Sequence, residues 1–332
     1  MTRRGCRGSF VNNKTLAAID IGTNTLRLLI ATVRFNPEKQ SYSIKEIFSE
    51  RIITRLGGGL SGNGLLKKKA MSKSLSALKR FSSVLSRYDV YKTRAVATSA
   101  LREAGNSKEF LAEVKGATGL AVKIISGEEE ARIAASGMLI DIAAPETALM
   151  VDIGGGSTEL IFAKQGKPVL VKSLNLGVVY LAGRFMKHDP PFKEDLIGMD
   201  RYISEKIGPI VTPYSELKTQ DPELKTVLIG TAGTVTTLSA VAKGLAKFEH
   251  NKIHKSRLTL DKVKKIYSDI APVSSRERAG LVPFEPSRLD IIVPGTLILL
   301  KLMETFGFRE IIVSNHGLRE GILVELHKKI MK

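Results

Sequence analysis

One pattern of residues occurs twice in this chain, 132 residues apart. Residues 17–30 read AAIDIGTNTLRLLI, in which an apolar run ends at Asp20, a glycine turn follows, and a second apolar run begins. Residues 150–162 read MVDIGGGSTELIF and place Asp152 at the equivalent position. Apolar runs on both sides of a glycine turn are typical of a β-hairpin. Because the spacing is far too long for a solenoid repeat, the pattern predicts two related half-molecules whose hairpin turns point into a shared cleft.

The two turns contain groups that can bind phosphate. Glycine permits a positive φ and lets backbone N–H groups come close to a ligand, and successive N–H groups form a concave anion site. We expect the tip of the second hairpin at residues 154–157, although a plain glycine turn is the alternative. The candidate phosphate-binding residues are Gly22, Thr23, Asn24 and Thr25 in the first turn, and Gly154, Gly155, Gly156, Ser157 and Thr158 in the second.

Two acidic residues, Asp152 and Glu159, flank the second turn. Acidic groups beside an anion site are favourable mainly when a cation lies between them and the anion. Mg²⁺ suits this arrangement, because it uses one or two carboxylates together with phosphate oxygens and water. We therefore expect Mg²⁺ as the cofactor, with Mn²⁺ as the alternative metal and two solvated acids as the alternative without a ligand.

A third glycine-rich segment, residues 230–234, follows a short apolar strand at 227–229 and precedes a helical pattern. A strand that leads through a glycine turn into a helix N-terminus is an anion-binding geometry, strengthened by the helix dipole. This makes Gly233 and Thr234 further candidate phosphate-binding residues. A helix start that packs tightly because its residues are small is an equal alternative.

The candidate catalytic residues belong to two further segments. In KIISGEEEARIAASGM, residues 123–138, the spacing of Ser126 and Glu129 predicts a capping box at a helix start. Glu130 lies about 100° further round that helix, in the first turn, where the dipole favours its ionised form. An ionised carboxylate near a phosphate cleft can orient and deprotonate water, although a solvated glutamate is the alternative. Arg102 falls near a second helix start, capped by Thr98 or Ser99, and arginine suits a bidentate grip on phosphate.

The composition points to a polyanionic partner. The formal net charge is +18, and such an excess is tolerated more readily when the working partner is negatively charged. The absence of Trp and of any recognised nucleic-acid motif speaks against specific nucleic-acid binding. The basic residues gather in the N-terminal arm (Arg3, Arg4, Arg7 and Lys14), at residues 67–69 and at residues 243–265.

Length and hydropathy bound the fold and the location. A chain of 332 residues with 43% hydrophobic side chains suggests two domains, and alternating helix and strand patterns indicate an α/β architecture. A single cysteine, Cys6, excludes a disulfide framework. The first ten residues lack an apolar core, so we expect no signal peptide, and the longest apolar tract, 291–303, is too short for a bilayer. We expect a cytoplasmic protein without a membrane partner.

Six segments together resemble the exopolyphosphatase / guanosine pentaphosphate phosphohydrolase (Ppx/GppA) family: AAIDIGTNTLRLLI, ATSALREAGN, ISGEEEAR, VDIGGGSTELIF, GTAGT and SNHGLREGIL, in this order. The resemblance extends from about residue 16 to 325. It implies an α/β fold with two ribonuclease-H-like domains of the actin/Hsp70/sugar-kinase superfamily and an interdomain cleft. Because the chain ends at residue 332, we expect the short form, with an N-terminal domain of residues 1–127 plus about 306–332 and a second domain of residues 128–305.

The resemblance also implies an activity and roles for residues. Members of this family release terminal phosphate from polyphosphate, convert pppGpp to ppGpp in the stringent response, or do both, with Mg²⁺. The implied partners are polyphosphate or guanosine penta- and tetraphosphate, and a second copy of the chain in a homodimer. The implied roles are a general base for Glu130, a grip on the transferred group for Arg102, and metal binding for Asp152 and Glu159, with Asp20 acting through water. Asn315 stands where many relatives have an aspartate, which affects a contact near the C-terminal crossover.

Three other functions share parts of this pattern. A kinase or ATPase of the same superfamily would have the same turns, and a non-catalytic polyphosphate or alarmone sensor would have the turns without needing Glu130. A nucleic-acid-binding module would use the basic surface alone. Release of orthophosphate from polyphosphate, pppGpp and ATP, measured side by side, separates these functions.

Overall fold

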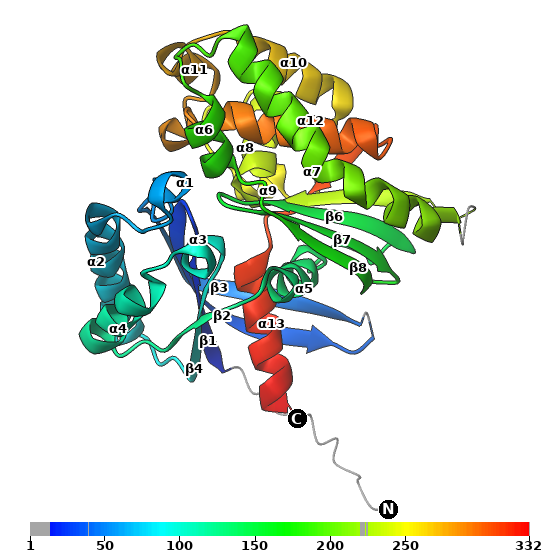
Figure 1. The fold of residues 1–332 in the computed structure, drawn as a ribbon. Helices are drawn as coiled ribbons and strands as arrows, with labels where there is room; N and C mark the ends of the chain where they lie inside the picture. Colours follow the sequence, from blue (N-terminus) through cyan, green and yellow to red (C-terminus); the bar gives the residue numbers. More distant parts are fainter. Residues whose placement is uncertain (1–13, 39, 220–222, 224, 332) are drawn as a thin grey trace, which may run out of the picture.

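The computed structural model of the chain describes residues 14–38, 40–219, 223 and 225–331, and in it two β-sheets with helices around them form two halves (Figure 1). The first sheet has the strand order β3 (Ser41–Ile53), β2 (Thr25–Asn36), β1 (Thr15–Ile21), β4 (Lys92–Ala97) and β5 (Val122–Ile124). The second has the order β10 (Arg257–Thr259), β11 (Glu310–Val313), β9 (Thr226–Thr231), β6 (Thr147–Ile153), β7 (Thr158–Lys164) and β8 (Lys167–Leu174).

The two sheets repeat one topology. In the first, β1 pairs antiparallel with β2 and parallel with β4, and β5 continues the parallel side. In the second, β6 pairs antiparallel with β7 and parallel with β9, and β11 continues the parallel side, with β10 added as an antiparallel edge strand. The strands β1 and β6 have the same length and begin 132 residues apart. The predicted duplication of one α/β half-molecule is therefore confirmed.

Helices lie on both faces of the two sheets. Their bounds are α1 (Leu60–Asn63), α2 (Lys68–Leu85), α3 (Ser99–Glu103), α4 (Ser107–Thr118), α5 (Gly127–Met138), α6 (Val178–Phe185), α7 (Lys193–Thr219), α8 (Ala232–Ala242), α9 (His250–Ile253), α10 (Leu260–Ile270), α11 (Ser275–Leu281), the 3₁₀ helix η1 (Pro286–Arg288), α12 (Ile292–Thr305) and α13 (Leu318–Met331).

The helix α2 shows why these segments cover a sheet. Its buried residues recur every three or four positions, so they form one apolar stripe along the helix. Together with Phe110 and Val114 of α4, that stripe packs against Ile19 and Leu28 in the core of the first half. In the second half, α7, α8, α10 and α12 contribute to the larger core around β6, β7 and β9.

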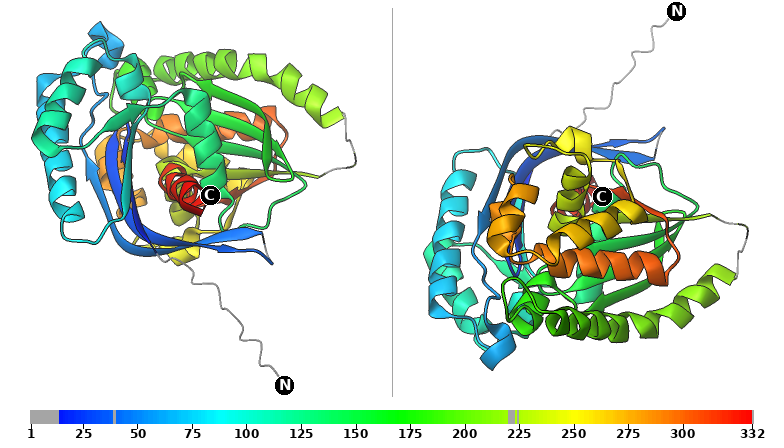
Figure 2. Two further views of the ribbon diagram at one scale, coloured as in Figure 1. Left: turned by 90° about the horizontal axis from the view of Figure 1, so that it is seen from below. Right: turned by 90° about the horizontal axis from the view of Figure 1, so that it is seen from above.

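Two helices, α5 and α13, lie side by side between the sheets (Figures 1 and 2). Apolar residues of α13, among them Ile322 and Leu326, pack against β1 and β2 of the first sheet. Residues Ala134 and Met138 of α5 pack against the second sheet, whereas Ile133 belongs to the core shared with α13. Because α5 contributes to both halves, the limits given above for the two domains stay a prediction.

Two further features of the sequence can be placed. Within the described ranges, none of the helices has the length and the apolar content needed to cross a bilayer.

Arg3, Arg4, Arg7 and Cys6 lie outside the described residues, whereas Lys14 places its ammonium group 3.5 Å from the centre of the Tyr91 ring.

Candidate active site

The tips of the two hairpins contact one another. Each turn is closed by the same backbone bond, from Gly22 N to Thr25 O at 3.1 Å and from Gly154 N to Ser157 O at 2.9 Å. A Cβ atom placed on Gly155 would lie 3.1 Å from the Cβ of Thr23. The turn of the first half therefore touches the turn of the second half, whereas the repeated pattern predicted only that both turns point into a shared cleft.

Close packing, and not an unusual backbone conformation, explains the glycines in these tips. Glycine permits a positive φ, but none of Gly22, Gly154, Gly155 and Gly156 has a φ in the left-handed region. Instead, a Cβ atom on Gly156 would lie 2.2 Å from Ser99 Oγ, and one on Gly177 would lie 2.2 Å from the backbone of Gly156. A side chain on Gly156 would therefore collide with the first half, and one on Gly177 would collide with the second turn itself.

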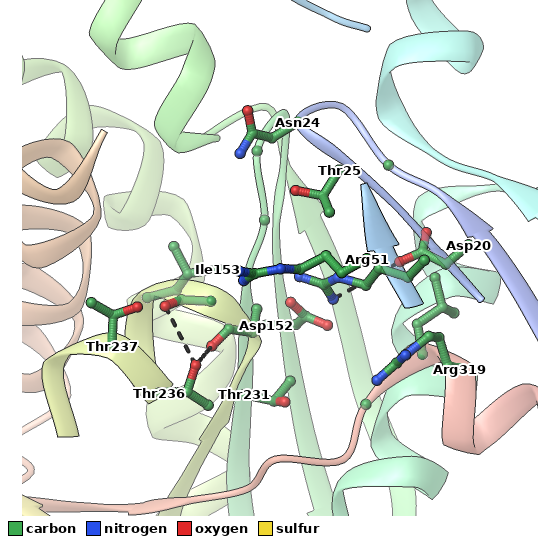
Figure 3. Close-up of a pocket in the computed structure, with 18 of the residues that line it drawn as sticks. Asp20, Asn24, Thr25, Arg51, Asp152, Ile153, Thr231, Thr236, Thr237 and Arg319 are labelled. Atoms are coloured by element: carbon green, nitrogen blue, oxygen red, sulfur yellow. Dashed lines mark hydrogen bonds and ion pairs between the residues drawn. The ribbon is translucent and has the colours of Figure 1, made fainter. Parts of the chain in front are cut away.

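A cavity of about 420 Å³ lies against the hairpin tips. In Figure 3, Asp20, Arg51 and Arg319 enter it from one side, Thr236 and Thr237 stand on the opposite side, and Asp152 lies between them. Of the residues predicted from the sequence, those that line this cavity are Asp20, Gly22, Thr23, Asn24, Thr25, Glu130, Asp152, Gly154, Gly155, Gly156 and Gly233.

Five predicted residues do not line the cavity, namely Arg102, Ser157, Thr158, Glu159 and Thr234. The Thr158 hydroxyl donates to Leu176 O, and Ser157 is buried beside Glu159. Thr234 packs against Gly295, where a Cβ atom would lie 2.6 Å from its Oγ1. These three hydroxyl groups contact other groups of the protein interior, so they do not reach a ligand in the cavity.

The helix α5 delivers Glu130 to the cavity. As predicted, Ser126 Oγ caps the helix by accepting from Glu129 N at 3.1 Å. The other half of the expected capping box is replaced, because the carboxylate of Glu129 accepts from Arg94 and Lys123. Because successive residues of a helix point about 100° apart, Glu129 lies toward the surface and the buried Glu130 faces the cavity.

Arg102 holds Glu130 in position. Its Nη1 donates to Glu130 Oε2 at 3.2 Å and to Ile125 O at 2.9 Å. The sequence predicted that Arg102 would grip phosphate directly, but its guanidinium is not part of the cavity lining. In this arrangement Arg102 fixes one oxygen of the carboxylate and leaves the rest of it to face the cavity.

Buried carboxylates near the cavity resist ionisation. Burial raises the pKa of Glu130 well above its ordinary value, the negative charge of Glu159 adds to this, and the positive charge of Arg102 opposes it. Burial, followed by the charge of Asp152, raises the pKa of Glu159 to about 8. Burial raises the pKa of Asp152 to about 6, although Arg27 lowers it. The expected effect of the helix dipole on Glu130 is therefore outweighed by burial and by neighbouring acids.

The placement of these acidic residues suits a metal ion that takes only some of its ligands from the protein. Among the described residues, no three His, Cys, Asp or Glu side chains are placed to enclose a metal ion. Asp20 and Asp152 do face the cavity, and Glu159 lies behind the lining, with Oε1 accepting from Ser173 Oγ at 2.8 Å. Because Mg²⁺ commonly uses one or two carboxylates and completes its shell with phosphate oxygens and water, these residues are compatible with it.

Four arginines that the motifs did not single out line the same cavity: Arg27, Arg51, Arg288 and Arg319. A local signal exists for Arg27, because it stands directly opposite Asp20 in the register of the first hairpin and their charged groups are 4.0 Å apart. The other three come from β3, η1 and α13, which the fold brings together from distant parts of the sequence. Guanidinium groups suit phosphate because they can donate two parallel hydrogen bonds.

The end of the cavity formed by the second half carries aromatic rings and Asn315. The rings of Phe248 and His250 are 5.0 Å apart, and those of Phe248 and Phe284 are 6.4 Å apart. Asn315 Nδ2 donates to His250 O at 2.7 Å, and Asn315 N donates to His254 Nδ1 at 3.2 Å. Asn315 therefore joins α9 to the segment that precedes α13.

Comparison with known proteins gives a consistent result. The model of the Ppx/GppA phosphatase family matches residues 37–330. Exopolyphosphatase 2 of Mycobacterium tuberculosis is 32% identical over 321 residues, which cover 94% of this chain and 98% of that protein. The PPX-GPPA enzyme of Aquifex aeolicus superposes with a TM-score of 0.77 at 32% identity, over 94% of this chain and 99% of that one.

A second solved structure, an exopolyphosphatase from Cytophaga hutchinsonii, superposes with a TM-score of 0.84 at 26% identity, over 95% of this chain and 98% of that chain. Together with the two sheets of repeated topology, these likenesses confirm the predicted fold class, an α/β two-domain fold of the actin-like type.

Proposed function

Because the chain belongs to the Ppx/GppA phosphatase family, we propose that it releases the terminal phosphate of inorganic polyphosphate by hydrolysing a phosphoanhydride bond. The observation that carries this proposal is a single cavity lined by the buried Glu130, by both hairpin turns and by four arginines. A polyanion needs the positive charge, and a hydrolase needs a group that accepts a proton from water.

The chain's own residues supply most of the chemistry. Glu130, with one oxygen held by Arg102, accepts a proton from the attacking water. The water oxygen bonds to the terminal phosphorus, the bridging P–O bond breaks, and the shortened chain leaves. Phosphoryl transfer spreads negative charge over the non-bridging oxygens, so backbone N–H groups of the two turns and the guanidinium groups of the cavity stabilise the transition state.

Asp152, which faces the cavity, would hold Mg²⁺, or Mn²⁺ in its place, with Asp20 acting through water. Glu159, opposite Asp152 in the strand register and behind the cavity lining, would be the second carboxylate. A bound divalent cation would neutralise charge on the phosphate oxygens. The mutual repulsion of the buried acids supports a cation at this place, because each negative neighbour raises the pKa of the others. Chelation with EDTA should abolish phosphate release, and added Mg²⁺ should restore it.

The substitution Glu130→Gln tests the proposal. We expect it to preserve the fold and the binding of polyphosphate and to lower kcat roughly 10²-fold or more, the size of a general acid–base contribution. The measurement is release of orthophosphate from polyphosphate by the purified protein. Glu129→Gln is the matched control, because it changes the same residue type one position away, on the side that binds Arg94 and Lys123. Near-normal turnover by Glu130→Gln would remove Glu130 from this role.

A second substrate, pppGpp converted to ppGpp, is supported by the aromatic end of the cavity. The rings of Phe248, His250 and Phe284 share the cavity with the arginines, and aromatic rings stack on nucleobases. Release of orthophosphate from polyphosphate, pppGpp and ATP under one set of conditions compares the candidates. Release from ATP alone would favour an ATPase, and binding of polyphosphate or pppGpp without any release would favour a sensor.

A further inference from the structure

One ion pair crosses the cavity and joins the two halves of the molecule. Arg51, near the end of β3 in the first sheet, donates from Nη1 to Glu285 Oε2 at 2.9 Å and from Nη2 to Glu285 Oε1 at 3.1 Å. Glu285 directly precedes η1 in the second half. Both residues line the cavity, and Glu285 is 4% exposed whereas the Arg51 side chain is 44% exposed. The carboxylate is thus a fixed, buried group, and the arginine is accessible from the cavity.

A second ion pair of the same kind lies nearby but outside this cavity. Arg55 donates from Nη1 and Nη2 to the two oxygens of Asp290, at 2.6 and 3.2 Å. Both side chains are partly exposed, and they line a neighbouring hollow of about 340 Å³ instead. The two pairs connect the same two segments of the chain with the same bidentate geometry. If the Arg51 pair only held the two halves together, the Arg55 pair would have the same role.

We propose that Arg51 is a phosphate-binding residue for the substrate and that Glu285 holds its place until a phosphate group displaces the carboxylate. This inference rests on the proposed function in requiring a polyphosphate-type substrate in the cavity. A carboxylate and a phosphate accept the same pair of parallel N–H bonds from a guanidinium, so the Glu285 carboxylate occupies Arg51 as a phosphate oxygen pair would.

The surroundings favour the exchange. Arg27 and Arg288 line the same cavity, and the positive charges of Arg27 and Arg51 contribute to lowering the pKa of Arg288 to about 10, after burial. A polyanion that reaches Arg51 therefore meets several mutually repelling cations, whose repulsion it relieves. A single surface arginine would offer no such gain.

Glu285 also has partners that remain after Arg51 leaves. Ser287 Oγ donates to Glu285 Oε1 at 2.6 Å, and the charge of Glu285 acts favourably on the guanidinium of Arg288. Removing the partner of a buried charge is strongly unfavourable when nothing replaces it. Here the freed carboxylate keeps a hydrogen bond and a cationic neighbour, so displacement by phosphate does not leave it unpaired.

The experiment compares Glu285→Gln with Asp290→Asn. Binding of inorganic tripolyphosphate is measured by titration calorimetry, and kcat and KM are measured with polyphosphate. Because a partly exposed ion pair contributes up to about 1 kcal/mol, Glu285→Gln should tighten tripolyphosphate binding and lower KM about threefold to fivefold, with little change in kcat. Asp290→Asn should leave both within about twofold, because its pair does not face the cavity. Equal effects of the two variants would mean an interdomain latch and would overturn the proposal, as would unchanged or weaker binding by Glu285→Gln.

Arg51→Gln completes the cycle. It should weaken tripolyphosphate binding about tenfold, within the range for a charge-assisted bond, and in its presence Glu285→Gln should no longer tighten binding. A persistent gain from Glu285→Gln without Arg51 would contradict the exchange. Thermal unfolding checks the fold of each variant, and Glu285→Asp, which keeps the charge but shortens the reach, should give an intermediate affinity.

Calorimetry measures tripolyphosphate binding independently of hydrolysis, so the exchange at Arg51 and the proposed hydrolase activity can fail separately. Tripolyphosphate binding that follows the expected order, without orthophosphate release, would refute the hydrolase and leave the exchange standing. Phosphate release by the wild-type protein together with unchanged affinity of Glu285→Gln would do the reverse.

Discussion

At the scale of single residues, His254 shows how one half-buried group couples stability to pH. Its Nδ1 accepts from Asn315 N at 3.2 Å, and its ring is 4.7 Å from that of His316. Burial, together with the charges of His316 and Lys255, lowers the pKa of His254 to about 4, although Asp141 and Glu320 act in the opposite direction. The imidazole is therefore neutral in the folded protein at neutral pH.

The pH dependence follows from the two pKa values of His254. The unfolded chain takes up a proton near pH 6.5, whereas the folded protein does so only near pH 4, so between these values the unfolded state binds more protons and the free energy of unfolding falls as pH falls. We expect this group to cost about 2 kcal/mol between pH 7 and pH 5. Urea unfolding at both pH values, with His254→Asn as the non-titrating variant, measures it. An equal loss in both proteins would contradict the prediction.

At the scale of elements, the contact between α5 and α13 depends on the absence of side chains. A Cβ atom on Gly137 of α5 would lie 2.0 Å from Gly317 O, and one on Gly321 of α13 would lie 1.9 Å from Ile133 O. No side chain fits at such distances without movement of the backbone. Because α13 packs on the first sheet and α5 on the second, this contact links the two halves behind the active-site cavity.

The substitution Gly137→Ala tests the importance of that contact. We expect a loss of about 1–3 kcal/mol of unfolding free energy, the usual cost of overpacking a filled interior, and lower activity because Glu130 lies on the same helix. The control is Gly116→Ala in α4, where nothing lies within 4 Å of the new Cβ atom. There alanine should stabilise the helix by up to about 1 kcal/mol. Chemical denaturation of the two variants gives both values, and a Gly137→Ala protein as stable as wild type would contradict the packing argument.

At the scale of the whole molecule, the net charge of +18 should act on the substrate before binding. A positive surface raises the local concentration of a polyanion, and salt screens this attraction over a distance of about 10 Å at 0.1 M. KM for long polyphosphate should therefore rise with added NaCl while kcat changes little. Sucrose, which adds solute without ions, is the control. A KM that does not respond to salt would show that the surface charge has no part in recruiting the substrate.

The sequence alone predicted the features that depend on local patterns. The repeated Asp20 and Asp152 hairpins, the cap at Ser126 and the helix that carries Glu130 follow from the order of apolar, glycine and capping residues over a few positions. Such patterns act through hydrogen bonds between near neighbours, so they can be read from the chain. The two-domain α/β class follows in the same way from the duplication and from the alternation of strands and helices.

The tertiary structure decided which of these groups meet and in what state. It placed Arg51, Arg288 and Arg319, far apart in the sequence, in one cavity, and it turned Arg102 from the cavity toward Glu130. It also reversed the expected effect on the pKa of Glu130, because burial and neighbouring charges depend on distances that no local pattern contains. The sequence determined the hairpins and their chemistry, and the packing of two halves against each other determined the electrostatics of the site, since charge interactions depend on distance in space.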